Sequence, residues 1–165
     1  MTTRWTGGCQ CGAVRYELLQ KPIGAHLCHC RMCQKQFDGF FAALASVPKA
    51  KFKVTRGAIS NFHSSADVQR GFCKACGTPL TYDPMTRDSI SIAIPTLDDY
   101  SEIVPENQYG IEARQSWVCD LHKTPAHVSG EDAVGNEFAK LLPGIAASNQ
   151  QHPDHDTALW PPEEA

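Results

Sequence analysis

Apolar and polar residues alternate along many short stretches of this chain, and a period of two is typical of half-buried β-strands. In residues 12–19, Val14, Tyr16 and Leu18 alternate with charged side chains, and residues 88–95 repeat the pattern with isoleucines. The pattern predicts a mainly β domain. The other predicted strands cover residues 25–28, 40–47, 51–55, 58–63, 67–73, 79–83, 108–113 and 116–119, with one or two helical turns at residues 31–37.

The last part of the chain departs from the strand pattern. Residues 132–142 carry apolar side chains at helical spacing, and the Pro143–Gly144 pair is expected to end this short C-terminal helix. After that the chain becomes polar and rich in proline. We therefore expect a single domain over residues 1–147 and a disordered tail over residues 148–165.

Composition narrows the class of protein further. The chain has 165 residues, 42% of them hydrophobic, which is enough for one globular domain with its own core. A formal net charge of −3 argues against a broad nucleic-acid-binding surface. No apolar run is long enough to span a membrane, and no apolar stretch near the N-terminus has the form of a signal peptide. We expect a cytoplasmic protein, in which disulfides are rare and clustered cysteines are metal ligands or redox groups.

Cysteine spacing provides the strongest signal of chemistry in the sequence. Zinc binds thiolates at about 2.3 Å and often takes two of them from one short loop, which CxC and CxxC pairs allow. Eight cysteines are present, and seven of them fall into three tight groups. These groups are Cys9 with Cys11, Cys28 with Cys30 and Cys33, and Cys73 with Cys76.

The first and third groups share a glycine directly after the last cysteine, at Gly12 and Gly77. A turn that wraps backbone N–H groups around a thiolate often needs a positive φ at that point, which glycine adopts at little cost. The four cysteines of these groups predict a closed tetrahedral zinc site: Cys9, Cys11, Cys73 and Cys76. Such a site would join the start of the chain to its middle and stabilise the fold.

The middle group has three cysteines and no following glycine. If the outer pairs hold one metal ion, Cys28, Cys30 and Cys33 are left with an open fourth position, which is the pattern of a catalytic zinc site. A substrate thiol that bound there would lose its proton. Arg31 and Lys35 stand beside this group, either as contacts for an anionic substrate or as an ordinary solvated face.

The same cysteines also permit a non-catalytic interpretation. Two purely structural zinc sites would form if His26, His29 or His63 completed the second group, giving a structural or thiol-binding module. A thioredoxin-like redox role for Cys73 and Cys76 is weaker, because Gly77-Thr78-Pro79 follows in place of a helix. Cys119 lies outside the groups and is not expected to be a ligand.

Three cysteine-containing runs together resemble the glutathione-dependent formaldehyde-activating enzyme family, also called the centromere protein V-like family. These are residues 8–16, 28–33 and 72–78, within a resemblance that covers roughly residues 5 to 120. The resemblance implies a β-tent fold of small antiparallel sheets and two Zn²⁺ per chain. The implied ligands are Cys9, Cys11, Cys73 and Cys76 for the structural ion, and Cys28, Cys30 and Cys33 for the catalytic ion.

The family's type reaction adds the thiol of glutathione to formaldehyde, giving S-hydroxymethylglutathione. The resemblance thus implies a zinc-dependent carbon–sulfur lyase acting on a small thiol and a small aldehyde, with no organic cofactor. A late stretch, Pro105 to Trp117, is similar to the family's Pro-x-x-His…Arg-x-Pro-Trp stretch. Arg114 and Trp117 are kept, whereas Gln108 stands at the histidine place and Ser116 at the second proline place.

Overall fold

A seven-stranded sheet forms the larger part of the fold in the computed structural model, which describes residues 5–128 and 137–147. Its neighbouring strands are antiparallel, except that the strand Asn107–Tyr109 pairs in parallel with the strand Ile23–Cys28. The strand order is β10 (Asn107–Tyr109), β3 (Ile23–Cys28), β4 (Ala42–Pro48), β9 (Ser89–Ala93), β8 (Pro79–Pro84), β7 (Val68–Phe72) and β6 (Ser60–Ser65). The predicted mainly β architecture is therefore confirmed.

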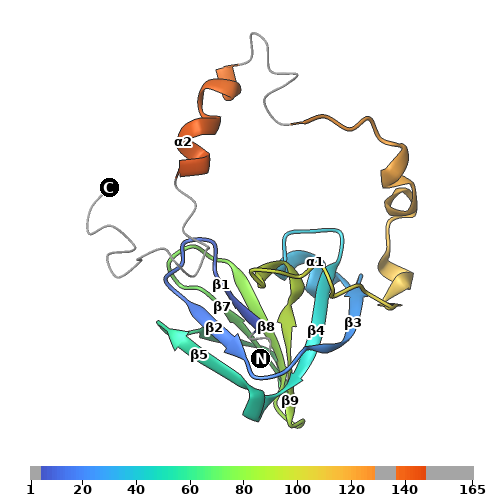
Figure 1. Ribbon diagram of the computed structural model, residues 1–165. Helices are drawn as coiled ribbons and strands as arrows, with labels where there is room; N and C mark the ends of the chain where they lie inside the picture. The colour runs from blue at the N-terminus through green and yellow to red at the C-terminus, as the bar shows by residue number, and fades with distance from the viewer. Residues whose placement is uncertain (1–4, 129–136, 148–165) are drawn as a thin grey trace. The chain divides into compact units, whose positions relative to one another are not determined.

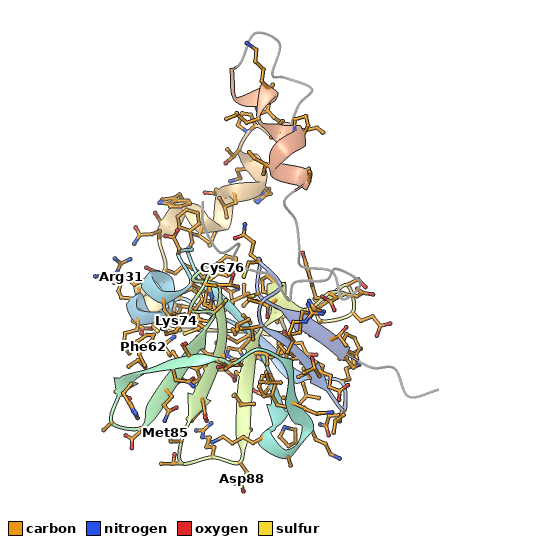
Figure 2. The ribbon with its side chains drawn as sticks, turned by 90° about the vertical axis from the view of Figure 1, so that its left-hand side faces the viewer. Arg31, Phe62, Lys74, Cys76, Met85 and Asp88 are labelled. Atoms are coloured by element: carbon orange, nitrogen blue, oxygen red, sulfur yellow. The ribbon has the colours of Figure 1, made fainter. Side chains whose placement is uncertain are left out.

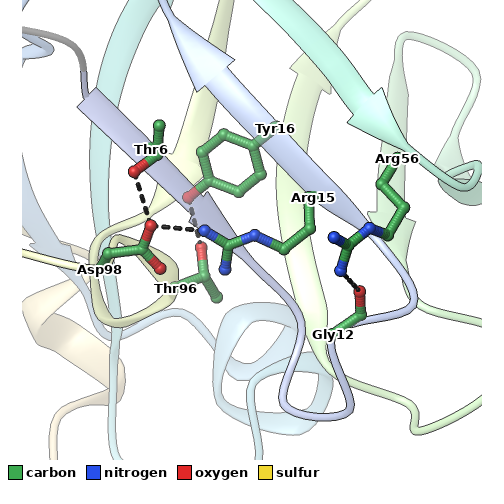
Figure 3. Close-up of polar contacts among 7 residues, drawn as sticks. All are labelled: Thr6, Gly12, Arg15, Tyr16, Arg56, Thr96 and Asp98. Atoms are coloured by element: carbon green, nitrogen blue, oxygen red, sulfur yellow. Dashed lines mark hydrogen bonds and ion pairs between the residues drawn. The ribbon is translucent and has the colours of Figure 1, made fainter. Parts of the chain in front are cut away.

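A second sheet has three strands, in the order β1 (Trp5–Gly8), β2 (Arg15–Leu18) and β5 (Phe52–Arg56), all antiparallel. The backbone of β1 pairs with β2 over its whole length. Polar groups tie this sheet to the loop after β9, since Arg15 forms an ion pair with Asp98 and Tyr16 hydrogen-bonds to Thr96 over 2.8 Å (Figure 3).

The main hydrophobic core contains side chains from both sheets. Because side chains alternate across a strand, each central strand of the larger sheet buries one set of residues and leaves the other set on the opposite face. In β4 and β9, Val47 and Ile92 belong to the core, whereas Ser46 and Ser91 line a cavity on the other face. This second face positions the candidate site.

Helix α1 (Arg31–Gln36) follows β3 directly and lies at one end of β3 and β4 (Figure 1). The predicted helical turns at residues 31–37 are therefore confirmed. Short 3₁₀ helices occur between strands, at η1 (Lys49–Lys51), η2 (Ile94–Thr96) and η3 (Ile111–Ala113).

The strand predicted at residues 116–119 is wrong, because this segment lies in the 3₁₀ helix η4 (Ser116–Lys123). The helix predicted over residues 132–142 falls partly on residues outside the described part of the chain. The described part contains the 3₁₀ helix η5 (Glu137–Lys140) and α2 (Leu142–Ala147). Pro143 therefore does not end a helix but occupies the first turn of α2, where its missing N–H has no helical partner to lose.

The chain divides into two compact units, one containing Met1–Arg114 and the other containing Gln115–Asn149. Both sheets and all seven grouped cysteines belong to the first unit. The prediction of one domain over residues 1–147 stays a prediction, and the predicted tail over residues 148–165 lies outside the described residues. Among the described helices, none is long and apolar enough to cross a membrane.

Candidate metal centres and the adjoining cavity

The four outer cysteines come together, although more than sixty residues separate the two pairs. Their Sγ atoms all lie within 4.8 Å of one another. Thiolates at about 2.3 Å around a tetrahedral ion lie about 3.8 Å apart. The Cys9–Cys11 and Cys11–Cys73 sulfur distances of 3.5 and 3.9 Å are close to that value. This group could therefore hold a metal ion.

Two similar turns hold these sulfurs in place. The N–H of Cys9 donates to the carbonyl of Val14 over 3.0 Å, and the N–H of Cys73 donates to that of Thr78 over 2.9 Å. The backbone N–H of Val14 also donates to Cys9 Sγ over 3.2 Å. The glycines that end the two turns, Gly12 and Gly77, have φ of +75° and +77°, as the sequence predicted.

Local structure also brings the middle cysteines together. Cys28 ends β3, Cys30 is the N-cap of α1, and Cys33 lies inside that helix. Their sulfurs lie within 4.8 Å of one another, so this group too could hold a metal ion. The outer group is part of the main core, whereas Cys33 belongs to a smaller cluster with Ala42 and Leu44.

Arg70 is the residue of this site that the sequence did not reveal. It lies in β7 with only 2% of its surface exposed. Its Nη1 and Nη2 atoms each donate to Cys33 Sγ over 3.5 Å, and its guanidinium lies over the Tyr82 ring, 4.9 Å from the centroid. Its other donors reach Ser64 and Gln36. A buried cation needs a counter-charge, which this cysteine group would supply if a bound metal ion held its sulfurs as thiolates.

The three thiols of the middle group differ in acidity. Burial raises the pKa of Cys33 to about 12, although the Arg70 guanidinium opposes this shift, and burial also raises the pKa of Cys28. The pKa of Cys30 is lowered, because the backbone N–H of Cys33, the neighbouring thiols and the charge of Arg70 together outweigh the opposing effect of burial. Cys30 is therefore the first of the three to lose its proton.

A cavity of about 430 Å³ opens beside the middle group, on the second face of the larger sheet. Cys28, Cys30 and Cys33 form part of its wall, together with Arg70 and Tyr82. No Asp or Glu is among the residues that line it. The outer four cysteines are absent from this lining, so the middle group is the one that faces a space of ligand size.

None of the three candidate histidines joins the middle cysteines. His26 lines the cavity but bonds the Gly24 carbonyl through Nδ1, and His63 is exposed on β6. His29 is buried, with Nε2 bonded over 2.9 Å to Gln108 Oε1. Within the described residues, the Nδ1 atom of His29 has no hydrogen-bond partner.

Gln108 and Gln34 fix the loop that carries the middle cysteines. Gln108 Oε1 also accepts a hydrogen bond from Arg114 over 3.1 Å, and the side chain of Gln34 donates to the carbonyl of His29 over 2.7 Å. The residue that replaces the family's histidine thus supports the loop from β10. Gln108 acts on a segment 79 residues earlier in the chain, a contact that local sequence does not reveal.

Other predicted residues lie elsewhere. Arg31 and Lys35 are exposed on α1 and do not line the cavity, so a solvated face describes them better than contact with a ligand in the cavity. Cys119 is exposed in η4 and belongs to neither cysteine group, as expected.

The fold and the two cysteine groups define a small β protein with two sites that could hold metal ions, one of them beside a cavity. The family model of the glutathione-dependent formaldehyde-activating enzyme matches residues 4–118. The chain therefore belongs to this family, as the three cysteine-containing runs predicted.

Relatives agree with this assignment at low identity. A Halomonas elongata protein, named as a candidate glutathione-dependent formaldehyde-activating enzyme, is 26% identical over 122 residues, or 68% of this chain and 78% of that protein. An uncharacterized lyase of Schizosaccharomyces pombe is 27% identical over 78 residues, covering 47% of this chain and 56% of its own.

A solved crystal structure, of a Rhodobacter sphaeroides protein, shares the fold. It superposes with a TM-score of 0.52 at 19% identity, covering 62% of this chain and 98% of that chain.

Proposed function

We propose that this protein is a zinc-dependent carbon–sulfur lyase that joins the thiol of glutathione, or of a related small thiol, to formaldehyde or another small electrophile. Family membership supports a glutathione-related lyase. The observation that carries the proposal is the position of Cys28, Cys30 and Cys33 in the wall of a cavity, with the buried Arg70 against Cys33.

The two cysteine groups would have different tasks. Cys9, Cys11, Cys73 and Cys76 would hold a structural Zn²⁺, since they are largely buried in the core and away from the cavity. Cys28, Cys30 and Cys33 would hold the catalytic ion. Zn²⁺ bound by three thiolates keeps a fourth position for a substrate thiol and lowers its pKa, so that it reacts as a thiolate at neutral pH.

The rest of the reaction depends on residues of this chain, which balance charge and confine the reactants. In the addition, the sulfur forms a bond to the carbonyl carbon, the π-electron pair of the carbonyl moves to oxygen, and the proton lost by the thiol ends on that oxygen. Arg70 offsets the negative charge of the thiolates, and the walls of the cavity confine the two reactants and exclude part of the water. The reverse elimination uses the same arrangement.

A purely structural module is the alternative, and the geometry gives it less support. A closed second site would need a fourth protein ligand, but His26, His29 and His63 do not join the cysteine group within the described residues. Further parts of the interpretation stay predictions of the sequence. These are the β-tent arrangement, the identity of zinc, the cytoplasmic location and the lack of a nucleic-acid partner.

Exchange NMR of glutathione mixed with formaldehyde tests the proposal directly. The zinc-loaded protein should exchange free and hydroxymethylated glutathione faster than buffer does. Cys30→Ser should return the rate to that of buffer while remaining folded, and Cys119→Ser is the matched control because Cys119 is exposed and outside both groups. A wild-type rate equal to that of buffer would remove formaldehyde as the electrophile.

A further inference from the structure

The cavity extends well beyond the cysteines along one face of the larger sheet. Alternate residues of β3 line it, from Cys28 at the end of the strand through His26 to Gly24 near its start. With a rise of about 3.3 Å per residue, these ends lie about 13 Å apart. In Figure 2, Arg31 of α1 lies near one end of the larger sheet, and Asp88 of the β8–β9 turn lies at the other end.

The end of the cavity away from the cysteines is polar. Serines of β4 and β9 line it, and Ser46 and Ser91 share a hydrogen bond of 3.0 Å between their hydroxyls. Ser89 and Arg87 complete this end. With no carboxylate in the lining, an arginine here gives the cavity a positive end.

The guanidinium of Arg87, unlike that of Arg70, is available to bind a ligand. Arg70 is buried and hydrogen-bonded to three side chains, those of Ser64, Cys33 and Gln36. The exposed side chain of Arg87, in contrast, makes no hydrogen bond or ion pair with the described residues. Its backbone N–H, bonded to the carbonyl of Pro84, holds it in the turn. The carboxylate of Asp83 is outside the cavity lining and pairs with Lys49 over 2.8 Å.

We infer that this polar end is a subsite for a carboxylate of the thiol substrate, with Arg87 as the residue that determines specificity for it. The inference rests on the proposed function, since it assumes that a thiol sulfur lies at Cys28, Cys30 and Cys33. An extended peptide covers about 3.3–3.6 Å per residue. A thiol of tripeptide length therefore spans most of the cavity, whereas free cysteine leaves Arg87 without a partner.

Binding of S-methylglutathione tests the subsite without requiring a free thiol or turnover. Isothermal titration calorimetry on the zinc-loaded protein should give a dissociation constant about tenfold weaker for Arg87→Gln than for wild type, because a charge-assisted contact is lost. Arg87→Lys should recover part of the loss. Lys51→Gln, which removes the same charge at an exposed position outside the cavity, should bind as wild type does.

The diethyl ester of S-methylglutathione provides a second measurement that needs no variant. It should bind about tenfold more weakly than the acid to wild type and equally weakly to Arg87→Gln. Equal binding of acid and ester by wild type, or no binding of the acid, would overturn the inference even if Arg87→Gln failed to fold. Arg87-dependent binding without formaldehyde exchange would instead retain the subsite and reject the proposed reaction.

Discussion

Arg70 holds both terminal nitrogens of its guanidinium 3.5 Å from the Sγ of Cys33, so a strand in the middle of the chain is joined to the cysteine helix α1. The contact is buried, and in the described residues no carboxylate pairs with Arg70. The proposed metal-bound thiolates of this group would give the buried cation its counter-charge.

Arg70→Met should weaken both the fold and the metal site. The apolar side chain leaves the thiolate charge at Cys33 without its partner, which costs about 3 kcal/mol. Arg70→Lys keeps the charge but loses the contact of two nitrogens with Cys33 Sγ, so stability and metal affinity should fall by less than in Arg70→Met. Urea denaturation gives the stability, and competition with a chromophoric chelator gives the metal affinity.

Lys35→Met is the matched control for this pair of variants, because Lys35 is a cation exposed on α1 and outside the cavity lining. It should change either measurement by less than about 0.5 kcal/mol. Wild-type metal affinity in Arg70→Met would show that the arginine does not balance the charge of the cysteine group.

Substitution in the outer cysteine group should have a different effect from substitution in the middle group. Cys11 and Cys73 are 62 residues apart in sequence, and cross-linking a loop of that length stabilises a fold by about 4 kcal/mol. Cys9→Ser should therefore lower the free energy of unfolding by about 4 kcal/mol in urea denaturation, whereas Cys30→Ser should keep most of the wild-type stability. Zinc removal by a chelator should reproduce the Cys9→Ser result in the wild-type protein. A Cys9→Ser protein as stable as wild type would contradict a structural role for this group.

The grouping of the cysteines was predictable because metal ligands in small zinc sites come from short loops with restricted spacing. Gly12 and Gly77 supported the same grouping, because the positive φ that such turns need depends on local geometry alone. The strands were also predictable where one face is buried, as in β2 and β9. Their period of two is present in the sequence itself.

Arg70 was not predictable, because nothing local distinguishes it from a solvent-facing arginine in a strand. Its burial depends on α1, which comes from a segment more than thirty residues earlier. Similarly, β10 pairs in parallel with β3 across about eighty residues, and this pairing brings Gln108 to His29. The strand predicted at residues 116–119 was wrong for another reason. A short apolar run does not by itself distinguish a strand from a 3₁₀ helix.

Gly110 should be intolerant of any side chain. Its φ of +67° strains other residues, and an added Cβ would lie 2.8 Å from the backbone nitrogen of Cys30. Gly110→Ala should therefore lower the free energy of unfolding by about 2 kcal/mol more than the cost of the left-handed backbone conformation alone. It should also make the middle cysteine group less well ordered. Urea denaturation measures the first effect, and the rate at which Cys30 reacts with a thiol reagent measures the second.

Gly24 offers a control with the same backbone conformation. Its φ is +62°, but nothing lies within 4 Å of an added Cβ. Gly24→Ala should therefore show only the cost of the left-handed conformation, about 1 kcal/mol. Equal losses in the two variants would mean that the contact with Cys30 does not constrain the loop.

The stability of the reduced, metal-free chain should pass through a maximum near pH 9. Hydrogen bonds from Thr78 and from the Cys11 backbone outweigh burial and lower the pKa of Cys76 from 9.0 to about 6, so its contribution is complete above pH 9 and is lost as the pH falls through 6. Burial raises the pKa of Cys33 from 9.0 to about 12, so its contribution is complete below pH 9 and is lost as the pH rises toward 12.

Urea midpoints measured with chelator and reductant, at steps between about pH 6 and pH 11, check this profile. Cys119→Ser should give the same curve as wild type, because Cys119 is exposed and outside both groups. With zinc bound, the ligands stay deprotonated across this range, so the decline above pH 9 should disappear and only proton competition at low pH should remain. A metal-free chain whose stability keeps rising beyond about pH 10 would contradict the assignment of neutral, buried Cys33 as the group that limits stability at high pH.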